Sequence, residues 1–422
     1  MNNYKLIGPF KQLLPMTKLP LRGAIKDVQL SVIAAAGILI KGEQIVAIGN
    51  FEKLYQSSKK LKPTITRQEN DQVGMPGLID AHTHICFGGS RAKDYAMRNG
   101  GSTYLEIAKA GGGIWDTVTQ TRKESLEQLV EGILQRAKRH INNGVTTIEV
   151  KSGYGLSVTE ELKMLRAIQL ANLRSKADLI ATCLAAHIFP KDYDGAKEDY
   201  LREISTTLFP QLIKEKLTNR VDAFIEEGAF SAKIIEPYLK KARQMGFDLT
   251  LHVDQFHTGG SAVAVKHKAI SADHLEASTD KEIEQLAKSK VIAMALPGAT
   301  LGLGCPFAPA RKLLDAGAAV AIASDWNPGS APMGDLLSQA AILGTFEKLS
   351  NAEVLSGITY RAAAALNLKD RGRIAKGLLA DIISFPSNDY REILYQQGQL
   401  KPCGVWKRGV AVSCKQSAVS FL

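Results

Sequence analysis

The sequence predicts an α/β protein, a (β/α)8 TIM barrel with a small β-sandwich domain built from both chain termini. Three observations lead to this prediction. The chain has 422 residues, which suits a barrel of about 250 to 300 residues with a smaller second unit. Between about residues 77 and 325, a short apolar run followed by a longer helical stretch recurs eight times. Polar residues end nearly every run, whereas an open doubly wound sheet would gather them at one switch point.

The eight apolar runs are expected to be the parallel strands of the barrel. In such barrels the catalytic residues lie where strands end and loops begin, and a chemically useful side chain ends most of these runs. The runs span residues 77–82, 147–151, 181–187, 222–227, 249–254, 270–274, 292–297 and 320–325. We therefore assign residues 77–375 to the barrel domain.

The two flanks have a different pattern. Short β-like runs lie at residues 31–40 and 44–48 near the start, and at 380–385 and 403–407 near the end. Neither flank alone holds enough apolar residues for a core. The sequence therefore predicts that residues 1–76 and 376–422 pair into one composite β-sandwich domain.

Charge and cysteine usage indicate the kind of binding partner and the cellular compartment. The net charge is +11, but the basic residues are scattered, and the densest cluster, Lys59–Lys62, has no interleaved aromatic residues. A solvated surface is expected, with attraction of an acidic small molecule as the alternative. The five cysteines form no C-x-x-C pair and are odd in number, which favours a reducing compartment. The longest apolar run, 31–40, is shorter than the roughly 20 residues that span a bilayer. We expect a cytoplasmic protein that binds neither nucleic acid nor membranes.

A metal site is indicated by His82-Thr-His84 at the end of the first strand. Residues two apart on a strand share one face, so two imidazoles can hold one cation. His252 ends the fifth run and Asp325 ends the eighth. Strands eight and one are neighbours in a closed barrel, and strand five faces them across the mouth. Three neutral imidazoles and one carboxylate, with an open position for water, suit zinc or ferrous iron.

These motifs resemble those of the amidohydrolase superfamily across the whole barrel. The resemblance is carried by Asp80, His82, His84, His252, His274 and Asp325, and by residues 372–381, which resemble the return into that superfamily's small β domain.

Strand four decides the expected metal count. Binuclear members of the superfamily carry a bridging, carboxylated lysine on that strand, where this chain has Glu226 and Glu227. The resemblance therefore implies one divalent ion, zinc or iron, held by His82, His84, His252 and Asp325. Lys151 lies on strand two, and we expect it to form a structural ion pair. Glu226 and Glu227 are expected either to contact the ligand histidines or to pack as ordinary polar residues.

The expected chemistry is hydrolysis by metal-bound hydroxide. A single metal ion lowers the pKa of bound water to about 7, so hydroxide is available at neutral pH. Asp325 can ligate the metal, accept the proton from that water and later hand it to a leaving nitrogen. His274 is not needed as a ligand and can polarise the carbonyl or hold the oxyanion. A core histidine with a satisfied hydrogen bond is the alternative for His274.

Several loops resemble those of the imidazolonepropionase family in particular, and this resemblance covers nearly the full chain. The matching stretches are residues 82–91, 103–108, 111–114, 149–156, 186–190 and 324–330. The resemblance implies hydrolysis of the cyclic amide C–N bond of 4-imidazolone-5-propanoate to N-formimidoyl-L-glutamate, a step of L-histidine degradation, and a homodimer. The substrate contacts that it implies are Arg91, Tyr154, His187, Gln255, Asn327, Gly329 and Ser330.

The residue types agree with such a substrate. Arg91 offers a planar fork for the propanoate carboxylate. Tyr154 can add a phenolic hydrogen bond, and Gly329 and Ser330 can supply backbone N–H groups and a hydroxyl. His187 could hydrogen-bond the ring or the reacting oxygen. A surface arginine, a packing tyrosine and a buried structural histidine are the respective alternatives for Arg91, Tyr154 and His187.

Gln255 departs from a part of the family, whose members carry either Glu or Gln at this position. An amide does not titrate, so Gln255 cannot act as a base. We expect Gln255 to orient the imidazolone ring, which leaves proton transfer to Asp325 and His274. Its neighbour Asp254 points to the opposite strand face and is expected to be structural.

Three other functions compete with this prediction. A superfamily deaminase acting on a purine or pyrimidine-like ring would use the same ligands, but a neutral base offers no carboxylate to Arg91. A non-catalytic scaffold usually loses metal ligands, and all four are present here. A nucleic-acid binder would show a steep salt dependence of binding, and nothing in the motif pattern requires one.

Overall fold

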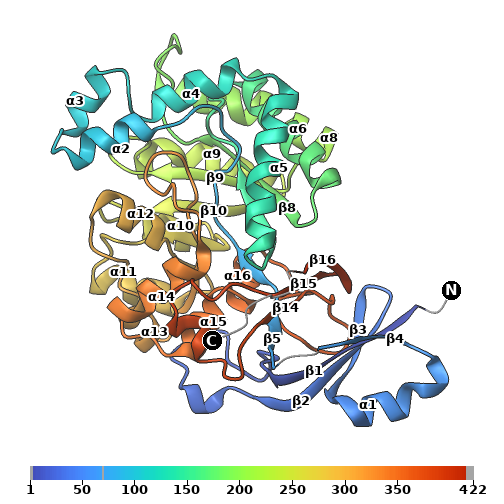
Figure 1. The fold of residues 1–422 in the computed structure, drawn as a ribbon. Coiled ribbons are helices and arrows are strands. Elements are labelled where there is room, and N and C mark those ends of the chain that lie inside the picture. Colours follow the sequence, from blue (N-terminus) through green and yellow to red (C-terminus); the bar gives the residue numbers. More distant parts are fainter. Residues whose placement is uncertain (1–2, 69–70, 415–422) are drawn as a thin grey trace.

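The computed structural model describes residues 3–68 and 71–414, and within them two eight-stranded sheets form the framework. One sheet is parallel and forms the barrel, and the other joins strands from both ends of the chain. Figure 1 shows the barrel region above and the second sheet below it, where blue N-terminal strands lie beside red C-terminal ones. Within the described residues, no helix is both long and apolar enough to cross a membrane.

The predicted order of the barrel strands is confirmed. Each strand pairs in parallel with the next one along the chain. The strands are β6 (Leu78–Asp80), β7 (Val145–Lys151), β8 (Asp178–Ala186), β9 (Arg220–Ile225), β10 (Asp248–Val253), β11 (Ser271–His274), β12 (Ile292–Ala295) and β13 (Ala319–Ile322). Every predicted run overlaps one of these strands.

The barrel closes just beyond the ends of β13 and β6. Thr83 and Trp326 form a parallel bridge there. The backbone N–H of Asp325 donates to the carbonyl of His82 at 3.0 Å, and that of His84 donates to the carbonyl of Trp326 at 2.9 Å. The first and last strands are thus joined at the segment that carries three of the four predicted metal ligands.

Helices surround the parallel strands and connect them. Several begin at a serine whose hydroxyl accepts a hydrogen bond from the first turn, such as Ser125 before α5 and Ser157 before α6. The helices of the barrel region are α2 (Ala92–Asn99), α3 (Tyr104–Lys109), α4 (Ile114–Lys123), α5 (Leu126–Asn142), α6 (Val158–Arg174), α7 (Lys197–Glu203), α8 (Phe209–Glu215), α9 (Ala232–Gln244), α10 (Gly260–Lys266), α11 (Asp280–Lys288), α12 (Pro297–Leu303), α13 (Ala310–Asp315), α14 (Leu336–Phe346), α15 (Asn351–Gly357) and α16 (Tyr360–Ala365).

The second sheet is the expected composite of both termini. Its order is β16-β15-β14-β5-β1-β2-β3, and β4 pairs with β1. The strands are β1 (Tyr4–Leu13), β2 (Ile33–Lys41), β3 (Gln44–Asn50), β4 (Thr64–Arg67), β5 (Val73–Pro76), β14 (Ile382–Phe385), β15 (Gly404–Lys407) and β16 (Val410–Cys414). The short helices α1 (Phe51–Ser58) and α17 (Glu392–Tyr395) follow β3 and β14.

Strand pairing in this domain is continuous, where a sandwich of two sheets was expected. The long strand β1 pairs with β4 along its first half and with β5 at its end, so it joins the two halves. The halves still share one hydrophobic core, as in a sandwich. Phe10 of β1 meets Trp406 of β15 edge to face, with ring centroids 6.4 Å apart.

An ion cluster links the second sheet to the barrel. Asp178, at the start of β8, lies 2.8 Å from the ammonium of Lys407 on β15 and also accepts from the guanidinium of Arg371. Lys407 in turn contacts Asp381 at 2.6 Å. The carboxylate of Asp178 therefore connects both parts of the structure.

Candidate metal centre

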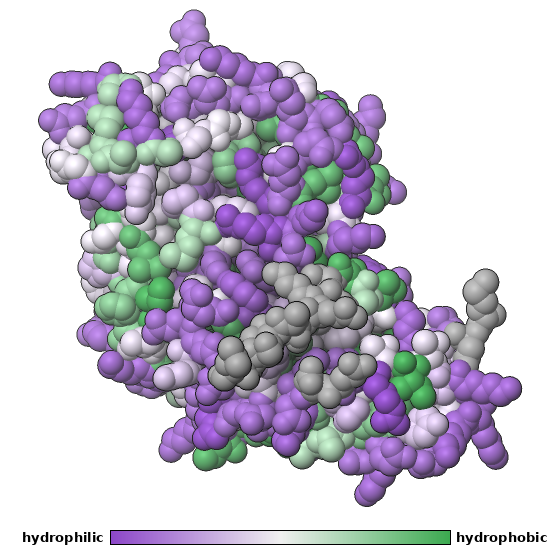
Figure 2. Space-filling view, viewed as in Figure 1, coloured by the Kyte–Doolittle hydropathy of each residue, from purple (hydrophilic) through white to green (hydrophobic). Residues whose placement is uncertain are grey.

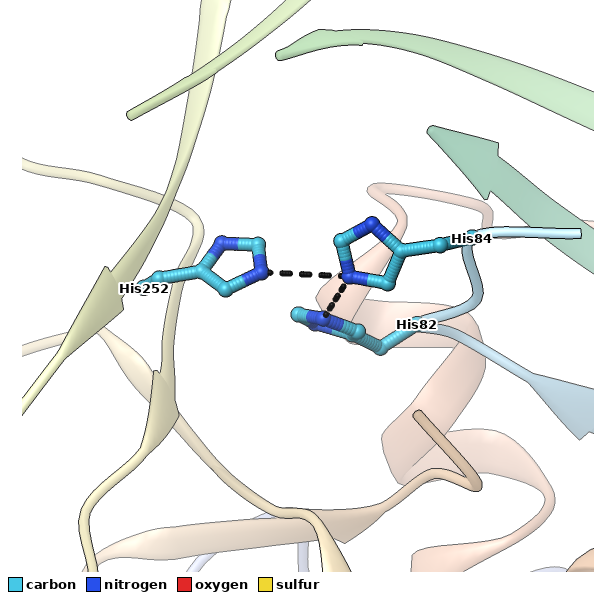
Figure 3. Close-up of side chains that lie close together, drawn as sticks. All are labelled: His82, His84 and His252. Carbon is cyan, nitrogen blue, oxygen red and sulfur yellow. Dashed lines mark hydrogen bonds between the residues drawn. The ribbon is translucent and has the colours of Figure 1, made fainter. Parts of the chain in front are cut away.

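Three imidazoles from opposite sides of the barrel converge on one point. His82 and His84 follow β6, and His252 lies on β10 (Figure 3). The Nε2 atom of His84 lies 3.3 Å from Nε2 of His82 and 3.3 Å from Nε2 of His252. Asp325 directs Oδ1 to the same point, 3.3 Å from Nε2 of His84 and 3.5 Å from Nε2 of His82. All four side chains are buried.

This arrangement fits a tetrahedral metal ion. Zinc–nitrogen bonds of about 2.0–2.1 Å in a tetrahedron would place neighbouring ligand atoms about 3.3–3.4 Å apart. Among the described residues, the ligand atoms of these three histidines lie close enough together, within 4.8 Å of one another, to share one metal ion.

The carboxylates beside two of the imidazoles support the same interpretation. Nδ1 of His82 lies 2.6 Å from Oδ2 of Asp273, and Nδ1 of His252 lies 3.0 Å from Oδ2 of Asp222. A carboxylate at Nδ1 favours a proton there, which leaves a lone pair on Nε2. Both lone pairs face Nε2 of His84, which has at most one proton to share. A cation at this point would satisfy all three nitrogens.

Burial keeps the ligand imidazoles neutral. Burial, with a smaller effect of the Lys151 charge, lowers the pKa of His82 well below its usual value. Burial also lowers the pKa of His252 to about 4, although the Asp222 carboxylate opposes this shift. At neutral pH these imidazoles are therefore in the form that ligates a metal.

Asp325 is ionised and held at a fixed angle. Burial would raise its pKa, but the hydrogen bond and charge of His84, with smaller effects of His274 and His252, lower it overall. Asn327 donates its side-chain amide to Oδ2 of Asp325 at 3.0 Å and to the Asp325 carbonyl at 2.7 Å. One carboxylate oxygen thus faces the histidines while the other is bound by Asn327.

Asn327 also organises the loop that follows. Its side-chain oxygen accepts hydrogen bonds from the N–H groups of Gly329 and Ser330, both at 2.8 Å. These two N–H groups, which were expected to face the substrate, are therefore used inside the loop. The hydroxyl oxygen of Ser330 also lies 2.9 Å from the Asn327 amide nitrogen, which it shares as a donor with Asp325.

His274 lies beside the three ligand histidines. Its ring centroid is 5.3 Å from that of His252 and 5.9 Å from that of His82. His274 and Leu275 have backbone φ values of +89° and +76°, which residues other than glycine rarely adopt. Burial would lower the pKa of His274, but the carboxylates of Glu276, 3.4 Å from Nδ1, and of Asp325 outweigh burial and raise it.

His187 and Tyr154 form a second wall of the site. The His187 ring stacks on His84 with centroids 5.4 Å apart, and Tyr154 lies 5.5 Å from His187. Nδ1 of His187 donates to the carbonyl of Gly153 at 3.0 Å, which leaves Nε2 unprotonated. Gly153 has a φ of +103°, and a Cβ atom there would lie 3.0 Å from the Leu184 carbonyl, so this turn requires glycine.

Arg91 and Gln255 lie at the margin of the site. Arg91 precedes α2, and its guanidinium binds the Asp94 carboxylate and donates to Thr117 at 3.3 Å. A Cβ atom at Gly329 would lie 3.2 Å from a terminal nitrogen of Arg91, so the arginine borders the loop after Asp325. Gln255 follows β10 and is half-buried.

Glu226 of strand four does not contact the ligand histidines. Glu226 accepts from the backbone N–H groups of Phe256 and His257 and from the His257 ring, so it fixes the loop after β10. The partner of His252 is Asp222, at the other end of the predicted run. Asp254 binds Gly260, Ser261 and Ser278 and is structural, as expected.

The sequence gives a weak signal for the two carboxylates that hold the histidines. Asp222 and Asp273 stand on the strands before and after the His252 strand, and Asp273 is paired in register with His252. Acidic residues on buried strands next to a ligand strand are such a signal. Arg98 donates to the Gly329 carbonyl at 3.1 Å. Nothing in the sequence pattern indicates this contact of Arg98 or the contact of Glu276 with His274.

Known proteins resemble this chain over most of its length. A model of the amidohydrolase family matches residues 73–412. An imidazolonepropionase of Bdellovibrio bacteriovorus is 38% identical over 94% of this chain and 95% of its own. An imidazolonepropionase of Kosmotoga olearia is 39% identical, over 91% of this chain and 92% of its own.

Solved structures share the fold at low sequence identity. A triazine hydrolase variant has a TM-score of 0.72 and 17% identity and covers 98% of this chain and 95% of its own. An adenosine deaminase of Xanthomonas campestris with bound zinc has a TM-score of 0.69 and 18% identity, covering 99% and 94% of the two chains. By sequence and by fold, the chain belongs to the amidohydrolase family and, within it, to the imidazolonepropionases.

Proposed function

We propose that this protein hydrolyses the cyclic amide C–N bond of 4-imidazolone-5-propanoate and releases N-formimidoyl-L-glutamate, as a step of L-histidine degradation. Relatives named imidazolonepropionase that are 37–42% identical and cover most of the chain support this substrate. The observation that carries the proposal is the convergence of three buried Nε2 atoms and one carboxylate oxygen at the mouth of the barrel.

One divalent ion, zinc or iron, would be held by His82, His84, His252 and Asp325. Such an ion acts as a Lewis acid and makes hydroxide available from water at neutral pH. The chain supports a single ion, because the strand-four glutamates lie elsewhere and Lys151 is buried in ion pairs.

Asp325 is suited to move the proton during the reaction. It is ionised, and Asn327 fixes the carboxylate, so Asp325 can take a proton from the attacking water. It can then deliver that proton to the ring nitrogen as the C–N bond breaks. His274, beside His252 and His82, would polarise the carbonyl and bind the developing oxyanion.

The remaining side chains would position the substrate. Arg91 keeps N–H groups on its terminal nitrogens for the propanoate carboxylate, while Asp94 holds the guanidinium. Nε2 of His187 and the phenol of Tyr154 would contact the ring, and burial raises the pKa of Tyr154 so that it stays a neutral donor. Gln255 would orient the ring.

The loop of Asn327, Gly329 and Ser330 would border the substrate beside Arg91. The hydroxyl of Ser330 would be its donor, and the two backbone N–H groups would keep the loop in shape.

The cellular location and the oligomeric state of the enzyme are part of the same proposal. An odd number of cysteines without a C-x-x-C pair supports a cytoplasmic location. A homodimer is proposed on the family resemblance alone.

A metal titration with a substrate panel tests the proposal. Protein stripped by a chelator should regain activity on 4-imidazolone-5-propanoate as zinc or ferrous iron is added, up to one ion per chain. Purine and pyrimidine-like rings, the substrates of the competing deaminase, should release no ammonia. Two tightly bound ions per chain, or activity confined to the deaminase substrates, would contradict it.

A further inference from the structure

One lysine lies among three carboxylates directly beneath the metal centre. The ammonium of Lys151 is 2.7 Å from Oε1 of Glu149, 2.8 Å from Oδ2 of Asp222 and 3.9 Å from Oδ2 of Asp273. All four side chains are fully shielded from solvent, at 0% exposure. Three carboxylates and one ammonium that are all closed off from bulk solvent form an unusual cluster, because uncompensated buried charge is costly.

Two of the carboxylates hold a ligand imidazole each. Oδ2 of Asp222, which faces the ammonium, also lies 3.0 Å from Nδ1 of His252. Oδ2 of Asp273 lies 2.6 Å from Nδ1 of His82. The same carboxylate oxygens therefore contact both the lysine and the ligand rings.

The third carboxylate, that of Glu149, holds the backbone between His82 and His84. Oε2 of Glu149 accepts a hydrogen bond from the N–H of Thr83 at 3.3 Å, and Thr83 separates His82 from His84. The backbone N–H of Lys151 also donates to the carbonyl of Thr83 at 2.9 Å. Every carboxylate near the ammonium thus contacts a segment that carries a ligand histidine.

Charge repulsion explains why a lysine is needed there. Asp222 and Asp273 stand on the strands on either side of β10, and Oδ2 of each lies near the same ammonium. Carboxylates that share one buried site repel each other. Without a cation between them, at least one would rotate away or lose its charge. Either change would release the imidazole that it holds.

We propose, on the basis of the metal site proposed above, that Lys151 is a positioning residue that presets the ligand geometry of His82 and His252. Its ammonium holds Asp222 and Glu149 in place and stands close to Asp273, so that these carboxylates keep the Nε2 atoms directed at one point. Lys151 would act only through these carboxylates, without contacting the substrate or the ion itself.

A positioning role for Lys151 and a pure charge effect would change metal affinity in opposite directions. If Lys151 acted only through its charge, removing a cation near a divalent ion would tighten metal binding. If Lys151 positions the carboxylates, removing it weakens metal binding. Changes to groups that orient metal ligands typically cost 10- to 100-fold in affinity, so we expect a loss of about that size.

The experiment measures the zinc dissociation constant of apo-protein by competition with a chromophoric chelator. Lys151→Met keeps most of the side-chain volume and should raise the dissociation constant by about 10- to 100-fold. Lys151→Gln keeps a hydrogen-bond donor without the charge and should give an intermediate value. The Gln variant keeps the test usable if burial of three carboxylates prevents Lys151→Met from folding.

Lys407→Met is the matched control. Lys407 is another buried lysine between two carboxylates, Asp178 and Asp381, but it lies in the second sheet. This variant should lower thermal stability and leave the zinc dissociation constant unchanged. Parental or tighter zinc binding by both Lys151 variants would overturn the role of Lys151. Absence of zinc binding by the parent protein would instead refute the metal site itself.

Discussion

At the scale of single residues, the chemistry depends on how Asp325 shares its two carboxylate oxygens. Oδ1 faces His82 and His84, and Oδ2 is bound by the amide of Asn327. Asp325 itself has a φ of +52°, so the backbone adopts a strained conformation that Asn327 stabilises. In the proposed function, Asp325 would both ligate the metal ion and carry the proton.

Replacing the charge of Asp325 should abolish most turnover. Asp325→Asn retains the shape of the side chain but cannot accept a proton, so kcat should fall by about 10²- to 10⁴-fold. Turnover should be measured at saturating metal, with metal content and circular dichroism checked for each preparation. Near-parental turnover would show that another group carries the proton, and His274 would be the next residue to test.

Replacing Arg91 should affect the acidic substrate selectively. A hydrogen bond between charged groups contributes about 1.5–3 kcal/mol, so Arg91→Ala should lower kcat/KM by roughly 10- to 150-fold. Arg91→Lys should restore only part of it, because an ammonium lacks the planar fork and its pairing with Asp94.

A neutral analogue provides the comparison for Arg91. The propanamide should be a poor substrate of the parent protein and should be little affected by Arg91→Ala. Arg166, an exposed arginine paired with Glu215, serves as a control, and Arg166→Ala should keep the parental kcat/KM. Equal handling of the acid and the amide by the parent protein would refute the role of Arg91.

The residue types explain how much of the site could be predicted. Histidines and an aspartate at strand ends are recognisable as ligands, and the structure brings His82, His84, His252 and Asp325 together. Asp222 and Asp273 were not predicted, because their contacts cross from one strand to the next and depend on register. The use of the Gly329 and Ser330 N–H groups inside their own loop could not be predicted either, since it depends on the conformation of Asn327.

At the scale of strands and helices, the barrel strands bring the ligands together and the second sheet supports the barrel from below. The strands could be predicted because each is a buried apolar run, so the pattern of the sequence reports them directly. The continuous pairing of the second sheet could not, because it depends on β1 bending between Ile7 and Phe10 and meeting two partners along its length.

The ion cluster around Asp178 should stabilise the junction between the two sheets above acidic pH. Burial would raise the pKa of Asp178, but Lys407 and Arg371 outweigh burial and lower it from 3.8 to about 2. A carboxylate with a lowered pKa stabilises the fold above its unfolded pKa, and this stability is lost as the pH falls through about 2. The shift corresponds to about 2 kcal/mol at neutral pH.

Urea unfolding of Asp178→Asn tests this contribution. The variant should lose about 2 kcal/mol relative to the parent at pH 7, and the difference should shrink as the pH falls from about 4 toward 2. Glu284→Gln, in an exposed pair with Lys288, should unfold like the parent protein. A difference that stays constant over this pH range would show that Asp178 stabilises through packing alone.

At the scale of the whole molecule, the candidate metal centre lies at the end of the barrel strands, and the visible face of the molecule is largely polar (Figure 2). Figure 2 shows a face that is mainly hydrophilic, with hydrophobic residues in small separate groups. The net charge of +11 would help to attract a substrate that carries a carboxylate. In the proposals above, the charged cluster around Lys151 and the guanidinium of Arg91 would act on the same small site.

Hydrolysis of the ring amide and deamination of a ring break different bonds. Hydrolysis of the ring amide transfers one oxygen atom from water to the carbonyl carbon, which becomes a carboxylate, and the ring nitrogen leaves with the formimidoyl group. No ammonia is released in this step. A deaminase would instead release ammonia from its substrate.

The most direct test is mass spectrometry of the product formed from 4-imidazolone-5-propanoate in water labelled with oxygen-18. The metal-loaded protein should yield N-formimidoyl-L-glutamate that carries one oxygen-18 atom in the newly formed carboxylate, and Asp325→Asn should yield almost none. Unchanged substrate, or release of ammonia from it, would contradict the proposed hydrolysis.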